Sequence, residues 1–132
     1  MVKRIFDDAA FRGGVKLFNH GDYFAAHEAW EELWLSASGD TRHFLQGLIQ
    51  WAIALYHFQR GNLNGARKLF HSGDALLTPL APAWQGVCVA ALRQDMASFL
   101  AEVSHGGEHD PVANTPRHGE SLRQKPMIRR AS

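Results

Sequence analysis

The residues of this chain that are best suited to chemistry lie in one short segment, between His27 and Trp34. His27 and Glu31 are four residues apart, and Trp34 follows three residues later, so on a helix all three share one face. An imidazole next to a carboxylate can transfer protons or hold a metal ion. Because tryptophan is usually buried, we expect this face to point inward, where the Glu31 carboxylate needs a partner.

A second line of polar residues follows in the next apolar segment. Arg42, Gln46 and Gln50 are spaced by four, and His57 lies seven residues beyond Gln50. A glutamine in the middle of an apolar helix requires hydrogen-bond partners. Antiparallel packing of the two segments would place Glu31 near Arg42 or Gln46. The sequence therefore predicts a semi-buried polar cluster between two helices, made of His27, Glu31, Trp34, Arg42, Gln46, Gln50 and His57.

The residue types in this polar cluster allow several interpretations. The cluster can be a hydrogen-bonded network that fixes the register of two helices, or a pocket for a peptide or small ligand. It can also be a catalytic site with Glu31 as base, or a metal site with His27, Glu31 and His57 as ligands. Helices place His-x-x-x-Glu pairs together often by chance, and the chain has neither a second such pair nor a cysteine close to this one.

We therefore expect a non-enzymatic scaffold or interaction module, without a metal ion or a cofactor. The alternative is a metal-dependent or acid/base hydrolase-like enzyme that uses His27 and Glu31. Solvent access separates these functions. An open site at the two residues favours a ligand or a reaction, whereas a sealed and fully hydrogen-bonded pair favours a structural role.

The elements that must position these residues are predicted to be helices. Apolar residues recur at helical spacing through the first 103 residues, and no segment alternates as a strand would. Residues 41–60 are apolar nearly all round, which is typical of the central helix of a bundle. The pattern predicts helices over about 7–19, 22–37, 41–60, 62–77 and 87–103.

A faint internal repeat indicates how these helices pair. Gly21 is followed by Ala26 and Trp30, and the same order of small and aromatic residues recurs forty residues later, after Gly61. The small residue lets two antiparallel helices approach, and the aromatic residue fills the space between them. Tetratricopeptide hairpins are built in this way, but with a shorter repeat. We expect an all-α, compact bundle of about five helices, made of two stacked helical hairpins and a C-terminal helix.

Composition excludes several classes of protein. The chain has 132 residues, of which 45% are hydrophobic and 20% charged, and its net charge is +1. Such a chain folds as a single domain, lacks the basic excess of a dedicated nucleic-acid binder, and has no apolar run long enough to span a membrane. No signal peptide is visible, and the lone Cys88 cannot form an intrachain disulfide. We expect a cytoplasmic protein whose partner is a protein, a peptide or a small ligand, rather than a membrane.

The composition changes near residue 104. Residues 104–132 contain two adjacent glycines, three prolines and many polar residues without an apolar period. The sequence therefore predicts a helical domain over 1–103 and a flexible polar tail over 104–132 that makes no core contacts.

Three segments of the chain resemble a known family. They run from Phe18 to Trp34, from Arg42 to Gln50 and from Gly61 to Ala66. In this order they are similar to the domain of unknown function 309 family, whose hallmark His-x-x-x-Glu-x-x-Trp is matched by His27, Glu31 and Trp34. The resemblance covers roughly residues 10–102. It implies a small all-helical protein of bacterial or archaeal type and brings no established activity.

The chain departs from the pattern of that family at three positions. Ala25 stands where the family often has glutamate, Leu35 where it often has arginine, and Cys88 where it often has aspartate. The missing carboxylate next to His27 weakens the case for a carboxylate-rich metal site.

Overall fold

The computed structural model describes residues 4–106 and 125–131 and confirms the prediction of a helical bundle. Each predicted helix is present, with ends within three residues of the expected ones. Besides the helices there are two 3-10 turns, Ile5–Asp7 and Thr78–Leu80, and a hairpin of two-residue strands, β1 (Ala83–Trp84) and β2 (Val87–Cys88), too short to show an alternating pattern. The helices are α1 (Ala9–Asn19), α2 (Tyr23–Leu35), α3 (Gly39–Gln59), α4 (Leu63–Leu77) and α5 (Val89–Gly106).

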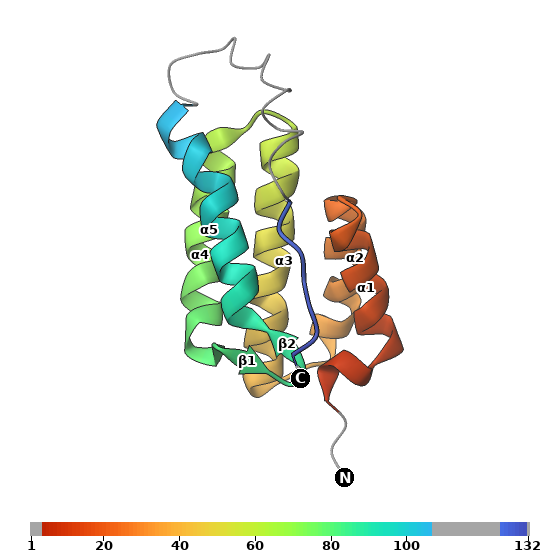
Figure 1. The fold of residues 1–132 in the computed structure, drawn as a ribbon. Helices are drawn as coiled ribbons and strands as arrows, with labels where there is room; N and C mark the ends of the chain where they lie inside the picture. The colour runs from red at the N-terminus through yellow and green to blue at the C-terminus, as the bar shows by residue number, and fades with distance from the viewer. Residues whose placement is uncertain (1–3, 107–124, 132) are drawn as a thin grey trace.

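The helices are arranged around α3, which lies in the middle of the bundle (Figure 1). Helix α3 packs against α4 on one side and against α2 on the other, while α1 pairs with α2. The pairs α1–α2 and α3–α4 are the two hairpins that the repeat predicts, and α5 packs along α4.

Local sequence signals set where the hairpins turn. Gly21 and Gly61 follow the first helix of each hairpin with φ angles of +89° and +81°, which strain residues that carry a Cβ. The side chains of Asp8 and Asn62 accept hydrogen bonds from backbone N–H groups in the first turns of α1 and α4.

In the first hairpin, a tryptophan is seated against a glycine. The Trp30 ring lies so close to Gly14 that a Cβ at this position would collide with it. The indole Nε1 donates a hydrogen bond of 3.2 Å to the carbonyl oxygen of Phe11, and the two rings stack with centroids 5.8 Å apart. The arrangement fixes both the distance and the register between α1 and α2.

The second hairpin repeats this arrangement with the helices in exchanged roles. Trp51 of α3 donates to the carbonyl oxygen of Phe70 at 2.9 Å and stacks on its ring, while a Cβ at Gly73 would lie 2.5 Å from the indole Cδ1. We call each arrangement a tryptophan–glycine lock, made of Phe11, Gly14 and Trp30 in one hairpin and of Trp51, Phe70 and Gly73 in the other. The aromatic residues of the predicted repeat, Trp30 and Phe70, thus fill the space between the paired helices.

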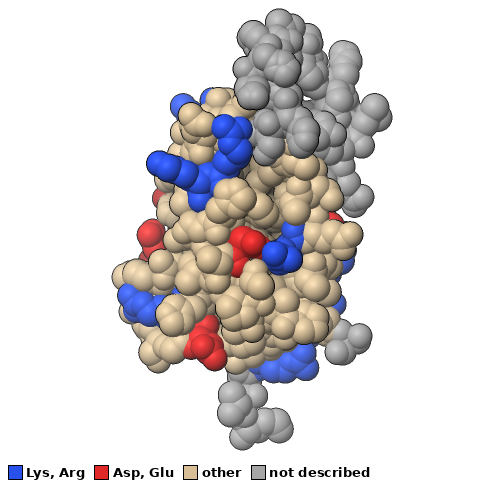
Figure 2. Space-filling model, turned by 90° about the vertical axis from the view of Figure 1, so that its left-hand side faces the viewer, with Lys and Arg blue, Asp and Glu red and all other residues tan. Residues whose placement is uncertain are grey.

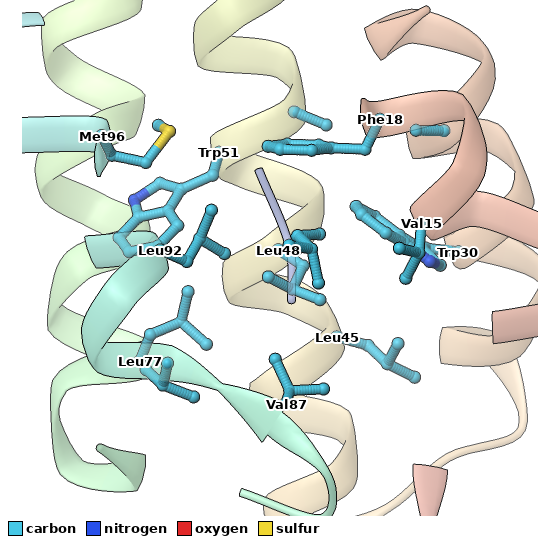
Figure 3. Packing of buried hydrophobic residues seen from close by; sticks show 14 of the residues in the cluster. Val15, Phe18, Trp30, Leu45, Leu48, Trp51, Leu77, Val87, Leu92 and Met96 are labelled. Atoms are coloured by element: carbon cyan, nitrogen blue, oxygen red, sulfur yellow. The ribbon is translucent and has the colours of Figure 1, made fainter. Parts of the chain in front are cut away.

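The core joins the two hairpins to α5 and β2. Figure 3 shows side chains from all five helices and from β2 converging on the space in front of α3. Each of the labelled side chains is almost or entirely inaccessible to solvent: Val15, Phe18, Trp30, Leu45, Leu48, Trp51, Leu77, Val87, Leu92 and Met96.

The outer face over α4 and α5 carries charges of both signs. Figure 2 shows basic and acidic side chains interspersed on this face, without a patch of one sign. Arg93 of α5 pairs with Asp74 of α4 through two hydrogen bonds, which ties the two helices together. None of the described helices is long and apolar enough to cross a membrane.

The expectation of a tail without core contacts is wrong for residues 125–131. Ile128 is only 4% exposed and belongs to the core, and the segment pairs with β2 through an antiparallel bridge between Val87 and Arg130. Two buried residues in so short a segment, Pro126 and Ile128, leave no helical period, so composition did not reveal the contact. Residues 107–124 of the expected tail lie outside the described residues, and the division at residue 103 stays a prediction.

The adjacent glycines of α1 give a matched test of the first tryptophan–glycine lock. We expect Gly14→Ala to lower the free energy of unfolding by about 1–3 kcal/mol, because the added methyl group collides with Trp30. Gly13 has open space around it, so Gly13→Ala should raise the free energy of unfolding by about 0.5–1 kcal/mol. Urea unfolding measures both changes, and effects of the same sign would contradict the close packing at Gly14.

The buried Tyr23 predicts a loss of stability at alkaline pH. Burial raises the pKa of the Tyr23 hydroxyl to about 12, whereas the unfolded residue ionises near pH 10. Folding therefore favours the neutral side chain, and this stabilisation is fully present below pH 10 and is lost as the pH rises to 12. We expect the free energy of unfolding to fall more steeply over this range in the wild type than in Tyr23→Phe. Urea unfolding at each pH measures this free energy. An equal fall between pH 10 and 12 in the two proteins would refute the role of Tyr23.

Candidate functional site

The predicted inward face of α2 is rotated by one residue in the structure. The buried residues of this helix are Tyr23, Ala26 and Trp30. Neighbouring residues on a helix differ by about 100°, so the next positions lie on the flank of α2 rather than in the core. Trp34 is accordingly half-buried, and the Glu31 side chain is 52% exposed. The expectation that Glu31 points inward is therefore wrong, whereas Trp34 packs against the edge of the core and its indole nitrogen is inaccessible to solvent.

His27 and Glu31 lie next to each other in an open position. Their Nε2 and Oε1 atoms are 3.6 Å apart, and the His27 side chain is 17% exposed. Its Nδ1 is 3.2 Å from the backbone carbonyl oxygen of Phe24 in the same helix. The pair is an ion pair only when the imidazole is protonated, and solvent reaches the carboxylate. Because Glu31 is exposed, the pair is not the sealed and fully hydrogen-bonded pair of the structural interpretation.

Arg42 contacts α2 through the end of the helix instead of through Glu31. Its Nη1 donates hydrogen bonds to the carbonyl oxygens of Trp34, at 3.3 Å, and Ala37, at 3.2 Å. The guanidinium also lies over the Trp34 ring, 3.7 Å from its centroid. Arg42 thus satisfies carbonyl groups at the C-terminal end of α2 and stacks on the tryptophan of the motif.

The remaining predicted residues do not complete a hydrogen-bonded network. Gln46 and Gln50 are half-buried on α3, and Gln50 Oε1 is inaccessible to solvent without a hydrogen-bond partner in the described part of the chain. Trp34 Nε1 is in the same situation. His57 lies in the last turn of α3, where its Nδ1 is 3.4 Å from the side-chain nitrogen, Nδ2, of Asn62 just before α4. Within residues 4–106 and 125–131 no group of three His, Cys, Asp or Glu side chains could hold a metal ion.

Aromatic residues that the predicted cluster leaves out extend this surface. Phe24 is 45% exposed, and its ring centroid lies 5.0 Å from that of His27 and 5.1 Å from that of Tyr56 on α3. Arg60 lies over the Tyr56 ring at 5.5 Å. Phe24 precedes His27 by three residues, so the helical spacing that marks the motif also contained this signal.

These contacts form a line of two groups between α2 and α3: Phe24, His27 and Glu31 with Tyr56 and Arg60, and Trp34 with Arg42. We call this line the α2–α3 seam. It has an arginine stacked on an aromatic ring at each end and the His27–Glu31 pair between them. Its members are Phe24, His27, Glu31 and Trp34 from α2, and Arg42, Tyr56 and Arg60 from α3.

The energetic coupling of His27 and Glu31 tests the exposed geometry. We expect the double-mutant cycle of His27→Ala and Glu31→Ala to give a coupling of about 0.5 kcal/mol or less, because water screens the pair. Urea unfolding of the wild type, both single variants and the double variant measures it. A coupling above about 1 kcal/mol would indicate a buried pair and contradict the open position.

Two curated proteins are similar to part of this chain. A stretch of 57 residues is 40% identical to the uncharacterized protein YpuF of Bacillus subtilis (strain 168), covering 42% of this chain and 33% of that protein. An uncharacterized protein of Aquifex aeolicus (strain VF5) is 44% identical over 46 residues, or 34% of this chain and 14% of that protein. The chain thus matches a third or less of the length of these relatives.

A solved structure extends the similarity to most of the bundle. The conserved hypothetical protein TTHA0068 from Thermus thermophilus superimposes with a TM-score of 0.62 and 29% sequence identity, over 68% of this chain and 94% of that protein. The names of these relatives state no activity. Residues 11–69, which contain both the motif and the α2–α3 seam, match the model of the domain of unknown function 309 family, and the resemblance seen in the sequence is thereby confirmed.

Proposed function

We propose that this chain is a non-enzymatic interaction module whose α2–α3 seam binds a segment of a partner protein. The observation that carries the proposal is the exposed ring of Phe24 between two arginine–aromatic stacks, Arg42 on Trp34 and Arg60 on Tyr56. Aromatic residues and arginine are the types most enriched at the centres of protein interfaces. Aromatic rings offer a large apolar area at little cost in side-chain entropy, and arginine adds charge.

The orphaned polar atoms in this part of the molecule support a binding role. Burying a donor or an acceptor without a partner costs about 1–3 kcal/mol, and among the described residues Trp34 Nε1 and Gln50 Oε1 have no hydrogen-bond partner. A bound peptide carries main-chain N–H and C=O groups that can satisfy such atoms after small side-chain rotations. The hydrogen bonds that these two atoms gain would then contribute to the affinity for the peptide.

The position of the His27–Glu31 pair fits the rim of an interface. A catalytic carboxylate is typically shielded from water, whereas half of the Glu31 side chain is open to it. In the seam the pair adds polar contacts next to Phe24. Polar rims around an aromatic centre are typical of transient interfaces.

The lengths of the curated relatives support a modular role as well. The matched region makes up 33% of one relative and 14% of the other, so similar sequence is found within longer chains of different size. A compact unit that occurs within different longer chains is typical of a module that brings proteins together.

Site-specific photo-crosslinking in the native host tests the proposal. A crosslinking amino acid at Leu35, which is 69% exposed at the Trp34 end of the seam, should capture one discrete partner. We expect Phe24→Ala to reduce this product by about tenfold or more, since exposed aromatic anchors carry much of the binding energy. The matched control Gln94→Ala changes an exposed residue of α5 and should leave the product unchanged.

Two results would contradict the proposal. The first is a crosslinking pattern that does not depend on Phe24. The second is a hydrolytic activity of the purified protein that both His27→Ala and Glu31→Ala abolish, since the pair would then be a reaction centre.

A further inference from the structure

The segment 125–131 occupies a groove of the protein's own surface. Figure 1 shows it running as an extended strand between α5 and α1, in front of α3. Eighteen residues separate it from the end of α5. The floor of the groove is the hydrophobic core, its walls are α1 and α5, and β2 closes one end. It shares no residue with the α2–α3 seam.

Main-chain hydrogen bonds hold the segment in this groove. The Asn19 side chain of α1 binds both backbone groups of Ile128: Oδ1 accepts from the N–H at 2.8 Å, and Nδ2 donates to the carbonyl oxygen at 3.1 Å. Asn19 thereby takes the place of a neighbouring β-strand. On the opposite wall, Asp95 Oδ2 of α5 accepts from the N–H of Met127 at 3.3 Å.

Strand β2 continues the same type of recognition. The N–H of Cys88 donates to the carbonyl oxygen of Arg129 at 3.0 Å, and the N–H of Ala131 donates to that of Gly86 at 2.8 Å. An extended peptide that adds to a strand edge is a recurring mode of peptide recognition, in which the backbone supplies affinity and a few side chains supply specificity.

Four side chains of the segment supply that specificity, beginning with Pro126, which is buried. Ile128 is the apolar anchor and is 4% exposed. Arg129 forms an ion pair with Asp95 at 3.2 Å, while Arg130 lies 3.8 Å from Asp7 and stacks over the ring of Phe6 at 4.5 Å. The groove therefore selects an apolar residue followed by two basic ones.

We propose that this groove is a binding site for an extended peptide of a partner protein with an apolar anchor and two following arginines. The segment 125–131 fills the site in the free protein and competes with the partner. These contacts are made to the backbone, to the buried Pro126 and Ile128 and to the two arginines, so a peptide from another molecule can reproduce them. The tethered segment competes at a local concentration on the order of millimolar, so a partner must displace it.

Peptide binding to the full-length protein tests this inference. The probe is a fluorescent peptide with the sequence of residues 125–131, and the variant Ile128→Glu of the full chain empties the groove by removing the anchor. Circular dichroism first establishes that the variant is folded. We expect the peptide to bind Ile128→Glu at least about tenfold more tightly than the wild type, as measured by fluorescence anisotropy.

Matched controls assign the binding to the groove. A peptide with glutamate in place of the isoleucine should bind neither protein. Adding Asn19→Ala to Ile128→Glu should weaken binding by about tenfold, because both hydrogen bonds to the backbone of the anchor are lost. The exposed change Gln94→Ala on α5 in the same background should have no effect.

Three outcomes would overturn the inference: equal affinity for the wild type and Ile128→Glu, no binding to the folded variant at millimolar peptide, or a wild-type dimer that exchanges the segment between copies. Light scattering detects the dimer, in which the occupant would be a second copy instead of a partner. If Ile128→Glu does not fold, the double variant Arg129→Ala/Arg130→Ala loosens the segment without removing the anchor. It must then bind the peptide more tightly than the wild type does, and equal affinity would refute the site.

Discussion

The bundle depends on the contact between the indole ring of a tryptophan and a glycine on the paired helix. Each hairpin has one tryptophan–glycine lock, and each lock combines close approach, ring stacking and a hydrogen bond to a carbonyl oxygen. The buried indole nitrogen is satisfied in the same step that sets the distance between the helices. With both hairpins fixed in this way, α3 can lie between α2 and α4, and the α2–α3 seam takes its shape from that placement.

The fold was largely predictable from the sequence, because its signals are periodic and local. Turn glycines such as Gly21 and Gly61, and the nearly all-apolar residues 41–60, indicate where helices end and which one is central. The role of Trp30 and Phe70 was predictable for the same reason, since each follows its turn at the same distance. The β1–β2 hairpin was not, since two-residue strands contain no period.

The candidate site was only partly predictable, because helical spacing shows which residues share a face of α2 but not how that face is turned. Helix α2 carries Trp30 and Trp34 on faces about 40° apart, and either can lead the buried stripe. The core selected Trp30 because Gly14 leaves room for its ring, a contact between different helices that no spacing within α2 can show. Arg42 was placed near the right helix but against the wrong group, because backbone carbonyl oxygens at a helix end compete with carboxylates for a guanidinium. The docking of Ile128 depends on partners more than thirty residues away and left no local signal.

The tryptophan–glycine locks also constrain how related sequences can diverge. At Gly14 and Gly73 the space that a side chain would occupy is already filled by an indole ring from the paired helix. A larger residue at either glycine can be accommodated only if the tryptophan becomes smaller, and the smaller ring would lose its hydrogen bond to the carbonyl oxygen. The glycine and the tryptophan of each lock should therefore change together or not at all. Gly14 with Trp30 and Gly73 with Trp51 thus form pairs whose covariation would trace the hairpins through distant sequences.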